Sequence, residues 1–141
     1  MPAWGFAFPG PLRDELTALA LDGTKTATAG LAVDYVMDGV MPARVGDREV
    51  LLDSADRPVA IIEVTKISMS TIALVDDEFA RAEGEGFADA RDWREAHERF
   101  WSGYIDEIRT SLRDPSFELT DSTVVVCEWF RIVERLDGDA A

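Results

Sequence analysis

The stretch Leu21-Asp22-Gly23-Thr24-Lys25-Thr26-Ala27-Thr28 ends one helix and begins a strand. Apolar residues spaced on one helix face precede it, which predicts a helix over Pro11–Leu21. Gly23 is typical of the position just past a helix end, and the β-branched Thr26 and Thr28 favour an extended chain. Lys25 is therefore expected at the junction between a helix and a strand.

Lys25 is unusual because the chain has only two lysines, Lys25 and Lys66, among its 14 basic residues. An ammonium group can lose its proton when it is desolvated, whereas a guanidinium group stays charged. The hydroxyl groups beside Lys25 are weak nucleophiles until a base or a cation activates them. Two interpretations stay open at this stage: a functional lysine, as a base or as a charged clamp, and an ordinary polar turn.

The composition predicts a single domain, residues 1–141, in the cytoplasm. No apolar run approaches the roughly 20 residues that span a bilayer, so no membrane contact is expected. The one cysteine, Cys127, excludes an internal disulfide and is typical of a reducing compartment. One histidine and one cysteine cannot build a His/Cys zinc site, and no dinucleotide motif occurs; we expect no metal and no cofactor.

A formal net charge of −14 restricts the partners of this chain. Long nucleic acids are bound largely through Lys and Arg, and an acidic surface repels such a polyanion. Extended DNA binding is therefore not expected. A small, weakly charged ligand is compatible with this charge.

The clearest helical pattern covers Asp89 to Leu112, where apolar residues form a continuous stripe and Asp89 is a good N-cap. We predict one helix over this range. His97 lies near the centre of the stripe and Arg94 at its edge. His97 is therefore either a hydrogen-bonded core residue or a residue that faces a ligand.

Alternating or β-rich segments predict strands over 48–52, 59–67, 69–74 and 124–133. Glu128 shares the apolar face of the last strand, where an ionised carboxylate needs a cation or several donors. Lys25, Arg94 or His97 would supply that cation. A buried ion pair without chemistry and a ligand contact are both consistent with this position.

Three parts of the chain recur together in a known family. They are the Leu21–Thr28 stretch, the segment Phe79–Gly86 with its Glu83-Gly84-Glu85-Gly86, and the pair Trp93-Arg94-x-x-His97-x-x-Phe100 and Val125-Val126-Cys127-Glu128-Trp129-Phe130. In this order they resemble the ASCH domain, a branch of the PUA-like superfamily, and in particular its longer bacterial members. The resemblance extends from about Trp4 to Val133.

The resemblance implies an α+β fold: a PUA-like, mostly antiparallel β-barrel of five or six strands with flanking helices. It also implies a cleft lined by the Lys-Thr segment. We expect seven residues to converge on one pocket: Lys25, Thr26, Thr28, Glu83, Arg94, His97 and Glu128.

The resemblance further implies a function connected with RNA or modified bases. Characterised ASCH proteins include an amidohydrolase that deacetylates N4-acetylcytidine, and a ribonuclease. The amidohydrolase's catalytic lysine, threonine and glutamate correspond to Lys25, Thr28 and Glu83, the last as the proton carrier for the leaving group. Thr26, Arg94, His97 and Glu128 would then bind the substrate.

The preferred function is thus a hydrolase of a small acylated nucleoside, with a small nucleoside-like ligand or a short RNA as the partner. The alternatives are a non-catalytic module that binds RNA or a modified base, and a ribonuclease, which the negative charge disfavours. This chain is longer than the amidohydrolase and adds the helix with the Trp-Arg-x-x-His pattern. The sequence leaves the oligomeric state open.

Overall fold

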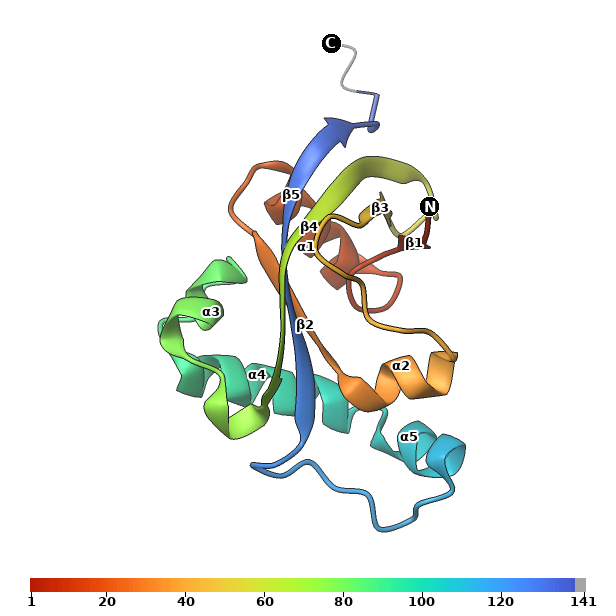
Figure 1. Cartoon of the computed structure of the whole chain (residues 1–141), viewed down its shortest axis with the longest axis vertical. Coiled ribbons are helices and arrows are strands. Elements are labelled where there is room, and N and C mark those ends of the chain that lie inside the picture. The colour runs from red at the N-terminus through yellow and green to blue at the C-terminus, as the bar shows by residue number, and fades with distance from the viewer. Residues whose placement is uncertain (139–141) are drawn as a thin grey trace.

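Five strands form one sheet in the order β1-β3-β4-β5-β2, seen in the computed structural model of Figure 1. The structure describes residues 1–138, so the last three residues of the predicted domain, 139–141, lie outside the described part. The strands are β1 (Ala3–Trp4), β2 (Ala27–Leu31), β3 (Arg48–Leu52), β4 (Pro58–Thr71) and β5 (Val124–Arg135). The helices are α1 (Pro11–Leu21), α2 (Ala32–Asp38), the 3-10 turn η1 (Ile72–Leu74), α3 (Asp77–Ala82), α4 (Ala90–Ser102) and α5 (Ile105–Leu112).

The sheet is mostly antiparallel, as predicted, but it is not closed into a barrel. The β3–β4, β4–β5 and β5–β2 pairings are antiparallel, and only β1 and β3 run parallel. Within residues 1–138, the edge strands β1 and β2 do not pair with each other. The prediction of a closed barrel is therefore wrong. With only two residues, β1 is too short to extend the curved sheet round to β2.

The predicted strands 59–67 and 69–74 are one continuous strand, β4, which ends in the turn η1. Register shifts at Ile61/Ile62 and between Val64 and Lys66 bend β4 without interrupting its pairing with β5. Such bulges increase the local twist, so a long strand can curve across the sheet. The helix predicted over Pro11–Leu21 is confirmed with the same bounds.

The predicted helix over Asp89–Leu112 is two helices, α4 and α5. Gly103 and Tyr104 separate them, and Tyr104 has φ −129° and ψ 23°, outside the helical region. The Tyr104 hydroxyl donates a hydrogen bond to Asp34 of α2 at 2.8 Å. The break lets α5 turn and pack beside α2 (Figure 1), which a straight helix would not permit.

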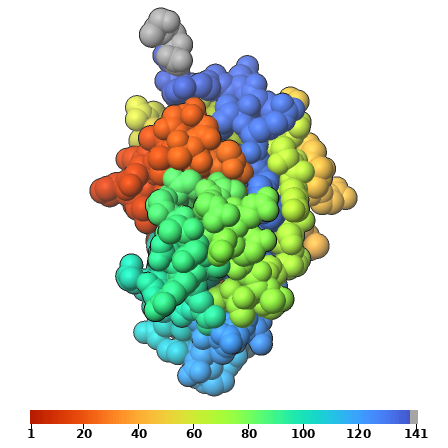
Figure 2. All heavy atoms as spheres, turned by 90° about the vertical axis from the view of Figure 1, so that its left-hand side faces the viewer, coloured from red at the N-terminus to blue at the C-terminus, as the bar shows by residue number. Residues whose placement is uncertain are grey.

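Two apolar clusters pack against different parts of the sheet. One lies under α3 and α4 and includes Phe79, Trp93 and Trp101. The other lies under α1 and includes Phe6 and Leu16. Figure 2 shows the α1 region, in red and orange, lying directly against the green and teal segment that holds α3 and α4. The candidate site lies where these two layers meet.

Candidate functional site

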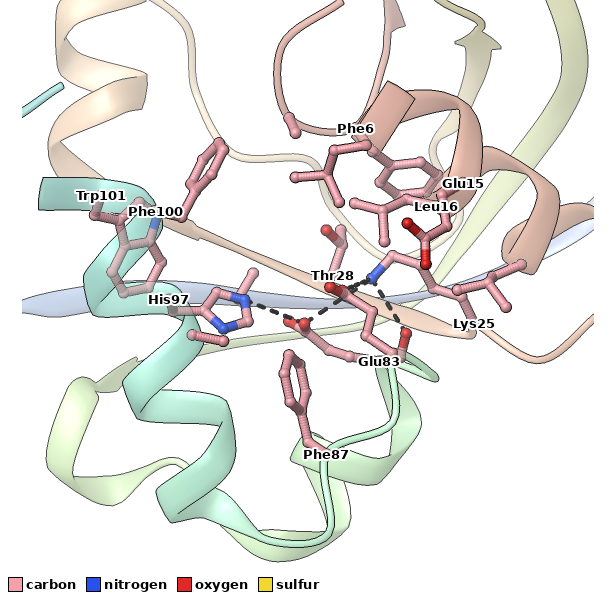
Figure 3. A pocket seen from close by; sticks show the side chains of 16 residues that line it. Phe6, Glu15, Leu16, Lys25, Thr28, Glu83, Phe87, His97, Phe100 and Trp101 are labelled. Atoms are coloured by element: carbon pink, nitrogen blue, oxygen red, sulfur yellow. Dashed lines mark hydrogen bonds and ion pairs between the residues drawn. The ribbon is translucent and has the colours of Figure 1, made fainter. Parts of the chain in front are cut away.

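A cavity of about 280 Å³ opens between α1, the edge strand β2, the segment after α3 and the helix α4. Its walls are largely apolar and aromatic, and a small group of charged side chains lies at its base (Figure 3). Such apolar pockets with a few placed polar groups are typical of small-molecule sites. The lining residues are Phe6, Ala7, Leu12, Glu15, Leu16, Leu19, Lys25, Thr28, Ala29, Glu83, Glu85, Phe87, Ala96, His97, Phe100 and Trp101.

Lys25 is buried, with an exposed fraction of only 2%, and its ammonium group contacts two glutamates. Its Nζ atom donates to Glu85 Oε2 at 2.6 Å and to the Glu83 backbone carbonyl at 3.3 Å. It also lies 3.9 Å from Glu83 Oε2 and 5.2 Å from the centre of the Phe6 ring. An ammonium group has three donors, so one N–H of Lys25 is left for a ligand.

Glu83 is fully buried at the end of α3 and pairs with His97 of α4. Its Oε2 lies 3.2 Å from His97 Nε2, and Figure 3 shows the two side chains and Lys25 pointing at one another. Burial acts to raise the pKa of the Glu83 carboxyl, but the charges of His97 and Lys25 outweigh it and hold that pKa below its usual range. Glu83 is therefore the permanent anion of the site.

His97 uses both of its ring nitrogens within the protein. Nδ1 lies 2.8 Å from the Trp93 backbone carbonyl, which can only accept, so Nδ1 carries a proton. Nε2 faces the Glu83 carboxylate, which is also an acceptor. Burial lowers the pKa of His97, and Glu83 more than restores it, so the pKa is raised. His97 thus acts as an imidazolium partner of Glu83, and its ring stacks on Trp93 at 4.3 Å.

Glu85 differs from Glu83 although the two are separated by one residue. Its side chain is 19% exposed, compared with 1% for Glu83, and it lines the cavity. Burial raises the pKa of Glu85, Lys25 opposes that shift, and the neighbouring charge of Glu83 adds to it, so the pKa lies above its usual range. Of these two glutamates, only Glu83 was predicted to be a site residue. The glycine on each side of Glu85 was the signal for a turn that presents a second carboxylate.

The loop after α3 is held tightly against the beginning of β2. Gly84 has a left-handed φ of 68°, and a Cβ at this position would lie 2.7 Å from the Lys25 Cα. The Thr26 N–H and the Thr26 hydroxyl both donate to the Ala82 carbonyl, at 2.9 and 3.1 Å. Thr26 therefore joins β2 to α3 and does not line the cavity, contrary to the prediction.

Two more predicted pocket residues lie elsewhere. Arg94 forms ion pairs with Glu98 and, at 2.6 Å, with Asp121, and it is not among the lining residues. Glu128 is 6% exposed and does not line the cavity either. Among residues 1–138 no cation pairs with Glu128, so the predicted partnership with Lys25, Arg94 or His97 is wrong. Lys25 and His97 are engaged by Glu83 and Glu85 instead.

The charges that shift the pKa of Glu128 are acidic. Burial, followed by the charges of Glu49 and Asp47, raises the pKa of its carboxyl to about 8. A carboxyl group with such a pKa is largely protonated at neutral pH, which explains how it is accommodated without a cation. Of the seven residues predicted to converge, four do so: Lys25, Thr28, Glu83 and His97.

The fold agrees with the comparisons to known proteins. The family model of the ASCH domain matches residues 3–134, and the chain belongs to the ASCH domain family, which is associated with RNA binding. The ASCH domain from Lactobacillus crispatus JV V101 is similar in structure, with a TM-score of 0.79 and 28% identity over 94% of this chain and 79% of that one. Protein EF3133 from Enterococcus faecalis V583 is also similar, with a TM-score of 0.81 and 26% identity over 96% of this chain and 77% of that one.

No curated protein is significantly similar to the chain. In the described part of the chain, no helix has the length and apolar character that crossing a membrane requires. The same residues contain no cluster of three or more His, Cys, Asp or Glu side chains suited to hold a metal ion.

Proposed function

We propose that this protein hydrolyses an amide or ester bond in a small acylated nucleoside, of which N4-acetylcytidine is the reference substrate. The observation that supports the proposal is that Lys25, Thr28 and Glu83 line one cavity. These are the residues that correspond to the lysine, threonine and glutamate of the amidohydrolase. Thr28 is drawn in Figure 3 with Lys25 and Glu83 among the side chains that line this cavity.

The size and walls of the cavity favour a base-sized group over a polymer. Its volume of about 280 Å³ lies near the lower end of the range for small-molecule pockets, roughly 300–1,000 Å³. Phe87, His97 and Phe100 supply ring surfaces on which a planar base can pack. The formal net charge of −14 opposes a long phosphate chain more than a neutral nucleoside.

In the proposed reaction, the Thr28 hydroxyl attacks the acyl carbon and Lys25 accepts the hydroxyl proton. Lys25 Nζ donates two hydrogen bonds within residues 1–138, and its third N–H then faces the negative charge that develops on the acyl oxygen. His97 has no free ring nitrogen for that oxygen, so its contribution is the charge that holds Glu83 ionised and a ring surface in the cavity wall.

The ion pairs of Lys25 with Glu83 and Glu85 also support a second function. The Lys25 ammonium group is held between two carboxylates, which fits a charged clamp for a base carbonyl as well as it fits a catalyst. This alternative is a module that binds a modified base without turnover. It predicts saturable binding of nucleosides that is nearly independent of salt, because no phosphate is contacted.

The test is incubation with a panel of N-acylated and O-acylated nucleosides, with the deacylated product measured by chromatography. We expect turnover by the wild type and a loss of at least 100-fold in Lys25→Ala and Thr28→Ala, the usual scale for removing a catalytic group (~10²–10⁴). Lys66→Ala is the matched control, since Lys66 lies over Trp129 away from the cavity. No turnover by the wild type would exclude the hydrolase and leave the binding module, which calorimetry with the same nucleosides measures. Equal turnover by the wild type and Lys25→Ala would exclude Lys25 as the catalytic base.

A further inference from the structure

Hydrolysis at this site needs a group that carries a proton from Lys25 to the leaving nitrogen. A lysine that serves as a base must first be neutral, and an amine leaves an acyl carbon only after it has gained a proton. Glu83, which the resemblance to the amidohydrolase implies for this role, is poorly suited to it. Its side chain is 1% exposed, and the charges of Lys25 and His97 on either side favour its ionised form.

Glu85 has the geometry that the role requires. Its Oε2 lies 2.6 Å from Lys25 Nζ, a short charge-assisted hydrogen bond along which a proton can pass. Its side chain is 19% exposed and lines the cavity, so the carboxyl group can reach both Lys25 and a bound molecule. Because the chain turns at Gly84, which has a left-handed φ, the side chains of Glu83 and Glu85 both reach the ammonium group of Lys25.

The geometry points to Glu85 as the proton carrier of this site, with Glu83 as a positioning residue that stays ionised and orients Lys25 and His97. This inference rests on the proposed hydrolase function. It assigns to Glu85 a role in the reaction that the resemblance to the amidohydrolase gave to Glu83.

The proton transfers balance in this arrangement. Lys25 first passes a proton to Glu85, which leaves a neutral amine and a carboxylic acid. The Thr28 oxygen bonds to the acyl carbon while its proton goes to Lys25. The carbon–nitrogen bond then breaks, the electron pair goes to nitrogen, and Glu85 gives its proton to that nitrogen. The products are an acylated Thr28, a lysine ammonium and a glutamate carboxylate, the same charges as at the start.

Water completes the cycle by the same route. Lys25 again passes a proton to Glu85 and then accepts one from the water that adds to the ester carbon. The bond from carbon to the Thr28 oxygen breaks, and Glu85 returns its proton to that oxygen. The carboxylic acid leaves, and no other reactant is required.

The electrostatic environment of the two glutamates supports this division. The pKa of Glu83 is lowered and that of Glu85 is raised. Where the environments of two neighbouring carboxyl groups shift their pKa values in opposite directions, one commonly serves as the acid and the other as the base or anion. The charged groups that face Glu85 are Lys25, two residues before β2, Glu83 after α3 and His97 on α4. Glu15 of α1 also lines the cavity.

The first test measures protonation in the full-length protein without substrate. Carbon-13 NMR of the glutamate carboxyl groups, assigned through the backbone, follows each group as the pH changes. We expect Glu85 to titrate above the ordinary value of about 4.3 and Glu83 below it. In Glu83→Gln, the signals of His97, the only histidine, should titrate at a lower pH because its anionic partner is gone. A Glu83 that titrates above Glu85 would overturn the assignment, whether or not any nucleoside is hydrolysed.

The second test measures turnover. Glu85→Gln should reduce kcat for N4-acetylcytidine by about 10²–10⁴-fold with little change in KM, and the loss should be smaller for an acyl ester of 4-nitrophenol, whose leaving group needs no proton. Glu78→Gln, on the exposed side of α3, is the matched control and should retain full activity. Wild-type activity in Glu85→Gln would overturn the role of Glu85 and leave the proposed function standing. An inactive wild type would exclude the hydrolase, and the titration would still decide which glutamate holds the proton.

Discussion

Gly84 packs so closely against Thr24 that a Cβ at position 84 would lie 2.3 Å from the Thr24 carbonyl oxygen. This contact sets the separation between the loop after α3 and the beginning of β2. Because Glu83 and Glu85 flank Gly84, the same contact places both carboxyl groups on Lys25. The ion group of the cavity thus depends on a residue that has no side chain.

Gly84→Ala should destabilise the protein more than the same change at Gly86. Both glycines have positive φ, 68° and 93°, which costs an L-residue about 1–2 kcal/mol, but nothing lies within 4 Å of a Cβ at Gly86. Gly84→Ala adds a clash with backbone, typically worth a further ~1–3 kcal/mol. Urea unfolding of the two variants measures the difference, and equal losses would show that the loop can move away from Thr24.

The His97–Glu83 pair should make stability depend on pH. The pKa of His97 is raised in the folded state, so its contribution is complete below about 6.5 and is lost as the pH rises through the higher folded value. The pKa of Glu83 is lowered, so its contribution is complete above about 4.3 and is lost as the pH falls through the folded value. The pair therefore stabilises the protein most between about pH 4.3 and 6.5.

The variant His97→Gln measures this effect. We expect it to lose about 1.5–3 kcal/mol at pH 5.5, the usual range for a hydrogen bond to a charged group, in addition to the loss of ring packing. The packing loss does not vary with pH, so the difference from wild type should shrink toward pH 9. A difference that stays constant from pH 5.5 to 9 would mean that His97 is neutral beside Glu83.

Glu128 should make stability depend on pH in the sense opposite to Glu83. Its pKa is raised to about 8, so the folded state holds more protons than the unfolded state from about pH 4.3 upward. Stability therefore falls as the pH rises through this window and levels off above about 8.

Glu128→Gln removes the charge and should be more stable than wild type at pH 9 by at least about 1.4 kcal/mol, the equivalent of one pKa unit, and the difference should shrink steadily toward about pH 4. Glu134→Gln, an exposed position on the same strand, is the control and should show no such trend. Equal stability of Glu128→Gln and wild type at pH 9 would contradict the raised pKa.

The variant Lys25→Arg distinguishes the two proposed roles of Lys25, a catalytic base and a charged clamp. Arginine keeps the positive charge between Glu83 and Glu85 but does not lose a proton in the useful pH range. If Lys25 is the base, turnover of N4-acetylcytidine should fall at least 100-fold while calorimetry still detects nucleoside binding. Lys66→Arg is the matched control. Substantial turnover by Lys25→Arg would exclude the base role and retain the clamp.

Local signals in the sequence determined the elements that carry the site. The apolar spacing before Gly23 predicted α1 with its observed bounds, and Asp89 caps α4, as predicted, by accepting from the Asp92 N–H. His97 was expected to face inward, and it does, although periodicity did not distinguish a core histidine from a ligand-facing one. Propensity, capping and periodicity act within one or two turns, so a single sequence is enough to read them.

Contacts between distant segments decided the rest. Arg94 lies at the edge of the helical stripe, so the sequence pattern does not decide which way its side chain points. In the structure it binds Asp121, 27 residues away. Tyr104, where the predicted long helix is interrupted, donates a hydrogen bond to Asp34, 70 residues away in sequence. Glu85 meets Lys25 across 60 residues because Gly84 packs on Thr24, and the sheet stays open because β1 is only two residues long. Each outcome depends on which surfaces meet after folding, and a local pattern does not contain that information.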